Sequence, residues 1–429
     1  MENHSRIGYQ IKAKTISFCA SICDGLNKPQ QKFVQQMVYG MISRKSVLLT
    51  EIARSLPQMA SFKKIHERLS LNLSKTKWKE ILENNQLETI KKRLKQDTVI
   101  ALDISEVVKE YAQKMEYLCR VRDGSSPDKQ LKNGYWLLEA TGINREQKHQ
   151  FPLLSRLYSS EATGFASENR MILTAFRRLR KAFAGHGIYT FDRGGDRELI
   201  LKPLLQEGFR FVIRMIGTRD VTVVNGNGEK KQNLLAAAQN LRCRCQNSFY
   251  SKRHKKLYQL SFGSLRFKLP FSDKLLTLVV VKGFGNKPMM LLTTESVRYR
   301  EQLWDTVQIY LARWGVEELI RFKKQAFNLE NIRVMGYKSL QNMMVLVNTA
   351  IMFLVYLESY CLRLSHHLRQ LIQHLPRAEN IKLIWYRLVD GICRVMSCAR
   401  QPLRDIRQRC NSGRQLELPL FSLLPLEAI

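Results

Sequence analysis

The spacing of apolar residues changes along this chain of 429 residues, and these changes constrain its fold more than any other feature. Between Lys28 and Leu94, apolar residues recur every three or four positions, which predicts amphipathic helices. From residue 96 onward, short apolar runs of strand length alternate with helical patterns, which is typical of a mixed α/β domain. Residues 338–410 return to helical spacing. The chain is therefore predicted to hold an α/β core between helical segments.

We expect five consecutive segments. The first and last are helical, the second and fourth build the α/β core, and the third is a β-rich insertion. In chain order their bounds are 1–95, 96–216, 217–290, 291–330 and 331–429. Within the core, strands are predicted at 98–103, 135–143, 151–158, 187–192 and 209–215, and helices at 167–184 and 199–207. Ser167 is the expected N-cap of the first of these helices.

The chain carries 70 Lys and Arg residues against 37 Asp and Glu residues, a formal net charge of +33. Such an excess favours a polyanionic partner, because clustered cations release counterions from phosphates. The charge is uneven: residues 1–95 hold 18 basic and 7 acidic residues, and residues 217–290 hold 14 and 3. A protein that coats RNA non-specifically would spread its charge more evenly. We therefore expect residues 1–95 and 217–290 to bind nucleic acid.

Cysteine and histidine usage argues against disulfides and zinc. The 9 cysteines include no CxxC pair, and the 8 histidines complete no zinc pattern, so we expect reduced, structural thiols in a cytoplasmic protein. The longest apolar run, Met343–Leu357, has about 15 residues and falls short of the ~20 that a membrane span needs. It is predicted to be a buried helix, and no membrane partner is expected.

Two short helical patterns flank a turn near the N-terminus. Leu48–Leu56 and Ala60–Leu71 are separated by Pro57-Gln58-Met59. Three cations share one face of the second pattern and are candidate DNA contacts: Lys63, Lys64 and Arg68. The arrangement is compatible with a helix-turn-helix unit that reads DNA. A solvated basic face on a helical bundle is an equally good interpretation.

Two buried-strand patterns each end in a carboxylate, at Asp103 and Asp192. Ligands bind where strands end at a sheet edge, and Mg²⁺ prefers hard oxygen ligands from one or two carboxylates together with substrate phosphates. A metal site is therefore one interpretation. The other is that each Asp caps the turn that follows its strand.

The residues after Asp192 strengthen the first interpretation. Asp192-Arg193-Gly-Gly-Asp196 combines acids, a cation and two glycines that permit close approach of the backbone to a ligand. Farther on, Arg210 and Arg214 share one face of a predicted strand, which suits contacts to a phosphate backbone. Surface ion pairs are the alternative for these arginines.

A helix is predicted from Tyr299 to Phe327, and four functional side chains fall on one stripe of it. Tyr310, Arg313, Glu317 and Lys324 stand at offsets 0, 3, 7 and 14. A stripe that packs in a core would be apolar at these offsets. A solvated charged face would explain the charges but not Tyr310 or the order.

This order resembles the Tyr-x2-Arg-x3-Glu-x6-Lys signature of bacterial insertion-sequence transposases with a DDE triad, of the cut-and-paste type that forms hairpin ends. The resemblance extends over roughly residues 30–400. Asp103, Asp192 and Glu317 match the three acids, at separations of 89 and 125 residues. The second separation leaves room for the β-rich insertion that such enzymes carry.

The resemblance implies an RNase H-like catalytic core that binds two Mg²⁺ (or Mn²⁺) ions through Asp103, Asp192 and Glu317. It implies cleavage of transposon ends in double-stranded DNA and transfer of 3′ ends to a target. By the same resemblance, Tyr310, Arg313, Lys324 and Arg210 would hold phosphates, and Trp314 could stack against a flipped base. Synapsis of two ends implies a homodimer, for which the apolar C-terminal helices are the expected interface.

One departure and two alternatives remain. The family's second platform aromatic is absent from Lys287–Leu292, so Trp304 or Phe284 would have to replace it. The chain could be a catalytically idle, DNA-binding repressor derived from a transposase. It could also be an RNase H-like nuclease that recognises branched DNA.

Overall fold

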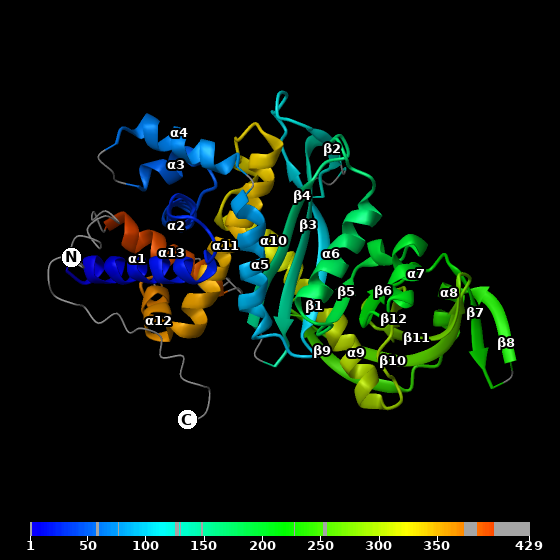
Figure 1. The fold of residues 1–429 in the computed structure, drawn as a ribbon. Helices are drawn as coiled ribbons and strands as arrows, with labels where there is room; N and C mark the ends of the chain where they lie inside the picture. Colours follow the sequence, from blue (N-terminus) through cyan, green and yellow to red (C-terminus); the bar gives the residue numbers. More distant parts are fainter. Residues whose placement is uncertain are drawn as a thin grey trace.

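The fold is taken from a computed structural model of residues 1–429. The described residues are 2–56, 60–75, 77–124, 128, 130–146, 149–226, 228–251, 255–372 and 384–398. Helices of both chain ends form one side of the molecule, a long sheet fills the centre, and the β-rich segment forms the other side (Figure 1).

The N-terminal segment is helical, as predicted. Its helices are α1 (Glu2–Ile22), α2 (Lys28–Arg44), α3 (Leu49–Arg54), α4 (Phe62–Leu73) and α5 (Lys77–Lys91). A capping box starts α2, in which Asn27 accepts from the backbone of Gln30 and the Gln30 side chain accepts from the backbone of Asn27. The two short helices around the predicted turn are present as α3 and α4, whereas Pro57-Gln58-Met59 lie outside the described residues.

The α/β core is built from six strands, two α-helices and a short 3₁₀ turn. In chain order these are β1 (Val99–Val108), β2 (Cys119–Arg122), β3 (Leu131–Asn144), β4 (His149–Tyr158), α6 (Glu168–Ala182), β5 (Ile188–Phe191), η1 (Arg193–Gly195), α7 (Glu198–Gln206) and β6 (Phe211–Arg214). Every predicted core strand and helix is present, and β2 is an addition. Ser167 caps α6 by accepting from the Arg170 amide at 3.2 Å. The central order is β4-β3-β1-β5-β6, with β1, β5 and β6 parallel and β3 antiparallel to β1 and β4.

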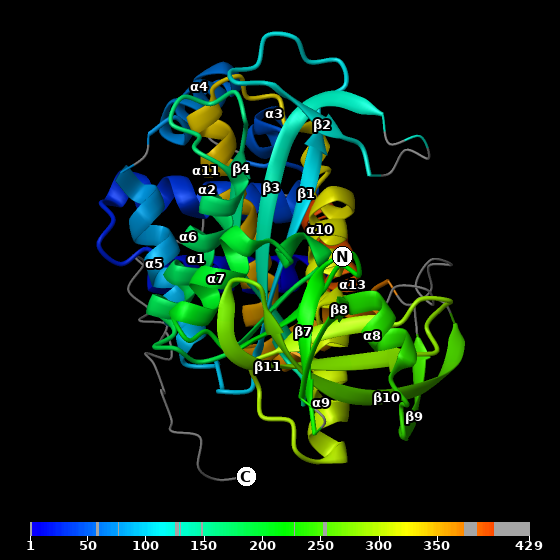
Figure 2. The same cartoon turned by 90° about the vertical axis from the view of Figure 1, so that its right-hand side faces the viewer.

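The β-rich segment continues this sheet. Its elements are β7 (Asp220–Asn225), β8 (Gly228–Asn233), α8 (Leu234–Asn240), β9 (Cys245–Ser251), β10 (Lys256–Leu269), β11 (Ser272–Lys282) and β12 (Met289–Thr293). Because β12 pairs antiparallel with β6, the strands join one 12-stranded sheet rather than a separate one. Figure 2 shows the strands of this segment curving away below the long strands β1 and β3.

The predicted long helix is two helices, α9 (Arg300–Ala312) and α10 (Trp314–Ala326), which meet at Arg313. The prediction of one continuous helix is therefore wrong. Apolar residues of both helices, among them Val307, Ile309 and Val316, pack on Val99 and Ala101 of β1. A short turn, η2 (Leu329–Asn331), leads to the C-terminal helices.

The C-terminal helices are α11 (Tyr337–Tyr360), α12 (Leu362–Gln370) and α13 (Ile384–Cys398). The helices α11 and α13 pack on α1 and α2, α12 packs on α11 and α13, and Lys45 pairs with Asp390 of α13. By length and composition α11 could cross a membrane, but 89% of its apolar window is buried in the protein. The predicted buried helix is confirmed. The apolar residues of α11, which suggested a dimer interface, pack against other parts of the same chain.

Seven cysteines of the described residues are free, namely Cys19, Cys23, Cys119, Cys243, Cys245, Cys361 and Cys393. Three of them are at most 2% exposed, which suits the predicted role as packing residues.

Candidate active site

The sheet register brings the two predicted aspartates together. Ala101 pairs with Thr190 across the parallel strands β1 and β5, so the same register sets Asp103 level with Asp192. Phe191 pairs with Ile213 of β6, so Arg214 stands level with Asp192 on its other side. Residues level with one another in neighbouring strands point to the same face. This is the face that α9 and α10 cover.

The two aspartates differ in their local setting. Asp192 follows β5, as predicted, and its carboxylate accepts from the Gly194 amide at 2.7 Å, so it also caps the turn η1. Asp103 was predicted to end its strand, but β1 runs on to Val108 and Asp103 lies in its middle. The strand continues because β3 pairs with β1 as far as Val108, whatever the polarity of the side chains.

Glu317 reaches this site from the first turn of α10, and Arg313 joins it to Asp103. The Arg313 guanidinium donates to Glu317 at 2.6 Å and to Asp103 at 3.3 Å. Its side chain is 7% exposed and its Nε atom is buried without an acceptor among the described residues. Burial opposes the charge of Arg313, but Tyr310, Asp103 and Glu317 outweigh burial and raise its pKa.

Burial dominates the ionisation of Asp103. It raises the pKa of Asp103 to about 7, with Arg313 opposing the rise and Asp192 and Glu317 adding to it. Among the described residues, no three or more His, Cys, Asp or Glu side chains are gathered closely enough to hold a metal ion. The cation between Asp103 and Glu317 is Arg313.

The other residues of the helical signature have structural partners. Tyr310 is 3% exposed in the apolar cluster beneath α9, and the Arg313 guanidinium lies 5.6 Å from its ring centre. Lys324 pairs with Glu106 of β1 at 2.7 Å and with Glu330 at 3.2 Å. Tyr310 is therefore buried, and Lys324 fastens α10 to the strand that carries Asp103.

Sequence reasoning missed a buried ion pair beside the site. Lys323 and Glu139 are both 0% exposed, and Lys323 donates to both Glu139 oxygens at 2.7 Å and to Asn348 at 2.5 Å. Glu139 stands directly opposite Asp103 in the β1–β3 ladder. The signal was present, because Lys323 lies four residues after Leu319 on the buried face of α10.

The predicted arginine contacts fall at two different places. Arg193 is exposed next to Asp192, and Arg214 stands level with it. Arg210 does not lie beside the acids, contrary to the prediction. It precedes β6, at the opposite end of these strands from Asp192, and binds Glu295 in a bidentate pair at 2.5 and 3.0 Å.

On α4, Lys63 and Lys64 are exposed, as a nucleic-acid contact requires. Arg68 is partly buried and donates to Gln36 of α2 at 3.2 Å. Arg68 therefore helps to fix α4 to the helical bundle.

The candidate stacking aromatics are packed together. The Trp314 ring meets Phe249 edge-on at 6.2 Å, and Phe284 meets Phe249 at 5.9 Å. Trp304 stacks on Phe262 at 5.5 Å. These rings belong to or pack against the apolar cluster between the sheet and the two helices α9 and α10.

Residues 159–353 match the family described as the transposase DDE domain. No curated protein matches the chain in sequence. Among solved structures, the chain is similar to the cryo-EM structure of a piggyBac transposase synaptic complex with hairpin DNA. The identity is 12%, the TM-score is 0.42, and the likeness covers 94% of this chain and 82% of that chain. Asp192 and Glu317 lie within the matched residues, and Asp103 of β1 precedes them.

Proposed function

We propose that this protein is a DNA transposase of a bacterial insertion sequence, working in the cytoplasm. It binds the terminal inverted repeats, cleaves the ends by phosphoryl transfer and joins the 3′ ends to target DNA. One observation supports this most strongly. The register of β1 and β5 sets Asp103 level with Asp192, and Arg313 links Asp103 to Glu317 on the helix that covers them.

The strand order supports an RNase H-like core. The arrangement β4-β3-β1-β5-β6 has three parallel strands and an antiparallel β3 beside β1, with α6 and α7 as the crossovers between the parallel strands. A nuclease core of this kind needs no protein nucleophile, since water or a DNA 3′-hydroxyl attacks the phosphate. We infer that residues 96–216 and 291–330 form this core, with 217–290 as its β-rich extension.

Asp103, Asp192 and Glu317 fit Mg²⁺ or Mn²⁺ in donor chemistry. Carboxylate oxygens are the ligands these ions prefer. Burial is the main cause of the raised pKa of Asp103, and a divalent cation at this position would favour its ionised form. The chemistry that a pair of such ions supplies is activation of the attacking oxygen and stabilisation of the leaving oxygen.

The surrounding cations would position the DNA. Arg193 and Arg214 flank Asp192 and would hold phosphates next to the cut, while Lys63 and Lys64 on α4 would contact the terminal repeat. A hairpin route needs a flipped base, for which the aromatic rings around Trp314 supply stacking surface. Two ends are cut in one complex, so we propose a homodimer in the synaptic state.

The test is metal-dependent cleavage of DNA that carries the inverted repeats flanking the gene. Asp103→Asn, Asp192→Asn and Glu317→Gln should each lower cleavage at least ~10³-fold while end binding stays within about twofold. Glu318→Gln is the matched control, because Glu318 is adjacent but pairs with Arg321 at 2.8 Å. It should keep most of the activity.

Two outcomes would replace the proposal. Tight binding of the repeats with no cleavage in Mg²⁺ or Mn²⁺ would favour the idle repressor. Cleavage of flaps or branches with no preference for the repeats and no joining of 3′ ends would favour the structure-selective nuclease.

A further inference from the structure

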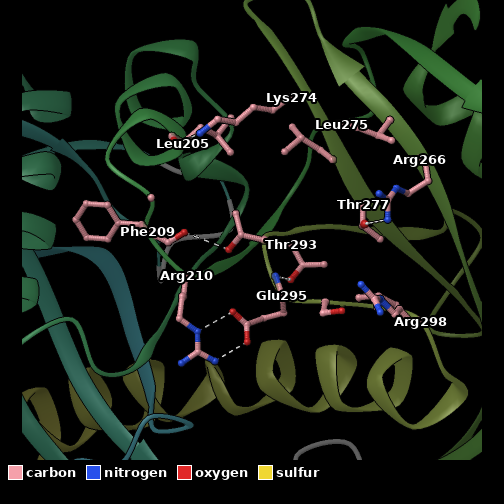
Figure 3. A pocket seen from close by; sticks show the side chains of 15 residues that line it. Leu205, Phe209, Arg210, Arg266, Lys274, Leu275, Thr277, Thr293, Glu295 and Arg298 are labelled. Atoms are coloured by element: carbon pink, nitrogen blue, oxygen red, sulfur yellow. Dashed lines mark hydrogen bonds and ion pairs between the residues drawn. The ribbon is translucent and has the colours of Figure 1, made fainter.

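A cavity of about 680 Å³ lies at the edge of the sheet away from the acids. It is lined by the segment before β6, the facing ends of β10, β11 and β12, and the loop that leads into α9 (Figure 3). Tyr189 of β5 pairs with Phe211 of β6, so Arg210 lies level with Ile188. Asp192 is four residues farther on, roughly 13 Å along the strand. The cavity is therefore a place separate from the acids.

The cavity is strongly basic. Four of its lining residues are cations (Arg210, Arg266, Lys274 and Arg298), and its one acidic lining residue is Glu295. Glu295 accepts two hydrogen bonds from Arg210, in the bidentate pair drawn in Figure 3. Because Arg210 balances the charge of Glu295, the other three cations give the cavity a surplus of three positive charges.

Those three cations have no acidic partner. No ion pair of the described residues includes Arg266, Lys274 or Arg298, although the chain has many such pairs elsewhere. Within the part of the chain that the structure describes, the Arg266 side chain makes a long contact of 3.4 Å with the Thr277 hydroxyl. Lys274 donates to the Leu205 carbonyl at 2.6 Å, which leaves two of its three ammonium hydrogens available.

Cations that line one cavity, and that have no acidic partner among the described residues, suit an anion with several oxygens. Arginine forks match phosphate oxygens, and a lysine adds a point charge. The cavity volume exceeds that of one phosphate, and its three cations come from separate elements, so a ligand with consecutive phosphates fits better than a single ion. A DNA backbone supplies such phosphates.

We propose that this cavity binds the phosphate backbone of DNA at a second position, away from the bond that is cut. The DNA partner rests on the proposed function, but the cavity needs no catalysis. It would hold flanking or target DNA through Arg266, Lys274 and Arg298, with Arg210 kept in place by Glu295.

The test measures binding of a 30-base-pair duplex of unrelated sequence over a series of salt concentrations. Each phosphate contact contributes a slope of about −0.9 to the logarithmic salt dependence. Arg266→Ala/Lys274→Ala/Arg298→Ala should therefore make the slope shallower by about 2–3. The matched control is Lys230→Ala/Lys231→Ala/Lys287→Ala, which removes the same charge from exposed positions of the same part of the chain outside the cavity. It should change the slope by less than about 1.

All binding is measured in EDTA on a Glu317→Gln background, so a protein that cannot cut DNA still reports on the cavity. Equal slopes for the cavity variant and the control would overturn the proposal. So would micromolar binding of inorganic phosphate that the cavity variant abolishes while its duplex slope is unchanged, because the ligand would then be a small phosphate. A shallower slope for the cavity variant, with the control variant's slope nearly unchanged, supports the cavity as a second DNA contact.

Discussion

The buried pair of Lys323 and Glu139 offers a sharp test of how α10 is held on the sheet. Both side chains are fully buried, and their contacts join α10, β3 and α11. Burial raises the pKa of Glu139 and lowers that of Lys323, since each charge has lost its water. The pair is tolerable only because each partner satisfies the other.

Removing one partner should cost much more than removing both. In Lys323→Met, the Glu139 carboxylate still accepts a hydrogen bond from the Ser155 hydroxyl at 2.5 Å but loses both hydrogen bonds from Lys323. The side-chain oxygen of Asn348 loses the hydrogen bond that it accepts from Lys323. An uncompensated buried charge of this kind costs about 3–5 kcal/mol. Glu139→Met/Lys323→Met replaces both with apolar chains of similar volume, so it should lie within about 1–2 kcal/mol of the wild type.

The assay is urea unfolding of the two single variants and the double variant, analysed as a double-mutant cycle. Lys324→Met is the matched control, because this neighbouring lysine is 21% exposed and should lose at most about 1 kcal/mol with Glu106. A double variant as unstable as Lys323→Met would refute the reasoning. So would a Lys324→Met variant that is destabilised as strongly as Lys323→Met.

Three more predictions concern single positions. Arg313→Gln removes the cation that lowers the pKa of Asp103, so that pKa should rise above about 7 in carboxyl NMR titrations in EDTA, and a fall would contradict the assignment. Burial opposes the ionisation of Glu83, but Arg156 and Arg178 together lower its pKa. The ionised Glu83 therefore stabilises the folded protein at neutral pH, and this contribution to the free energy of unfolding is lost as the pH falls below about 4. The gap in unfolding free energy between the wild type and Glu83→Gln should accordingly close on acidification. Gly134→Ala brings a Cβ to 2.5 Å from a backbone oxygen of Val107 and should cost about 1–3 kcal/mol, whereas Gly226→Ala meets nothing within 4 Å and should leave the thermal midpoint nearly unchanged.

Local patterns predicted the elements well where one face of an element is apolar. The strand 151–158, the helix capped by Ser167 and the buried α11 all follow from such patterns. The local patterns failed where backbone pairing or packing determines the length of an element. The polar residues Ser105 and Glu106 interrupt the apolar pattern, so the second half of β1 was not predicted; it forms because β3 pairs with it.

The sequence predicts residues for the candidate site but not their contacts. Spacing and the family resemblance gave Asp103, Asp192 and Glu317, which the sheet register and Arg313 bring together. The break at Arg313 was signalled only by the Gly315 that follows, a weak helix former whose close packing on Ile143 no local pattern reveals. Arg210 lies at the opposite end of the strands because it precedes β6, which runs parallel to β5, whereas Asp192 follows β5.

The packing of α11 and α13 on the first helices has a consequence for synthesis. The α2 helix lies against α11 and α13, and Lys45 meets Asp390, so the N-terminal bundle is completed by helices that are synthesised long after it. Domains generally fold as they emerge from the ribosome, but this bundle must wait for α11 and α13. A product that stopped before Ile384 would leave α1 and α2 with an uncovered apolar face. Such a fragment should aggregate or be degraded before it could bind DNA, so synthesis of α13 controls whether the basic N-terminal helices reach their folded arrangement.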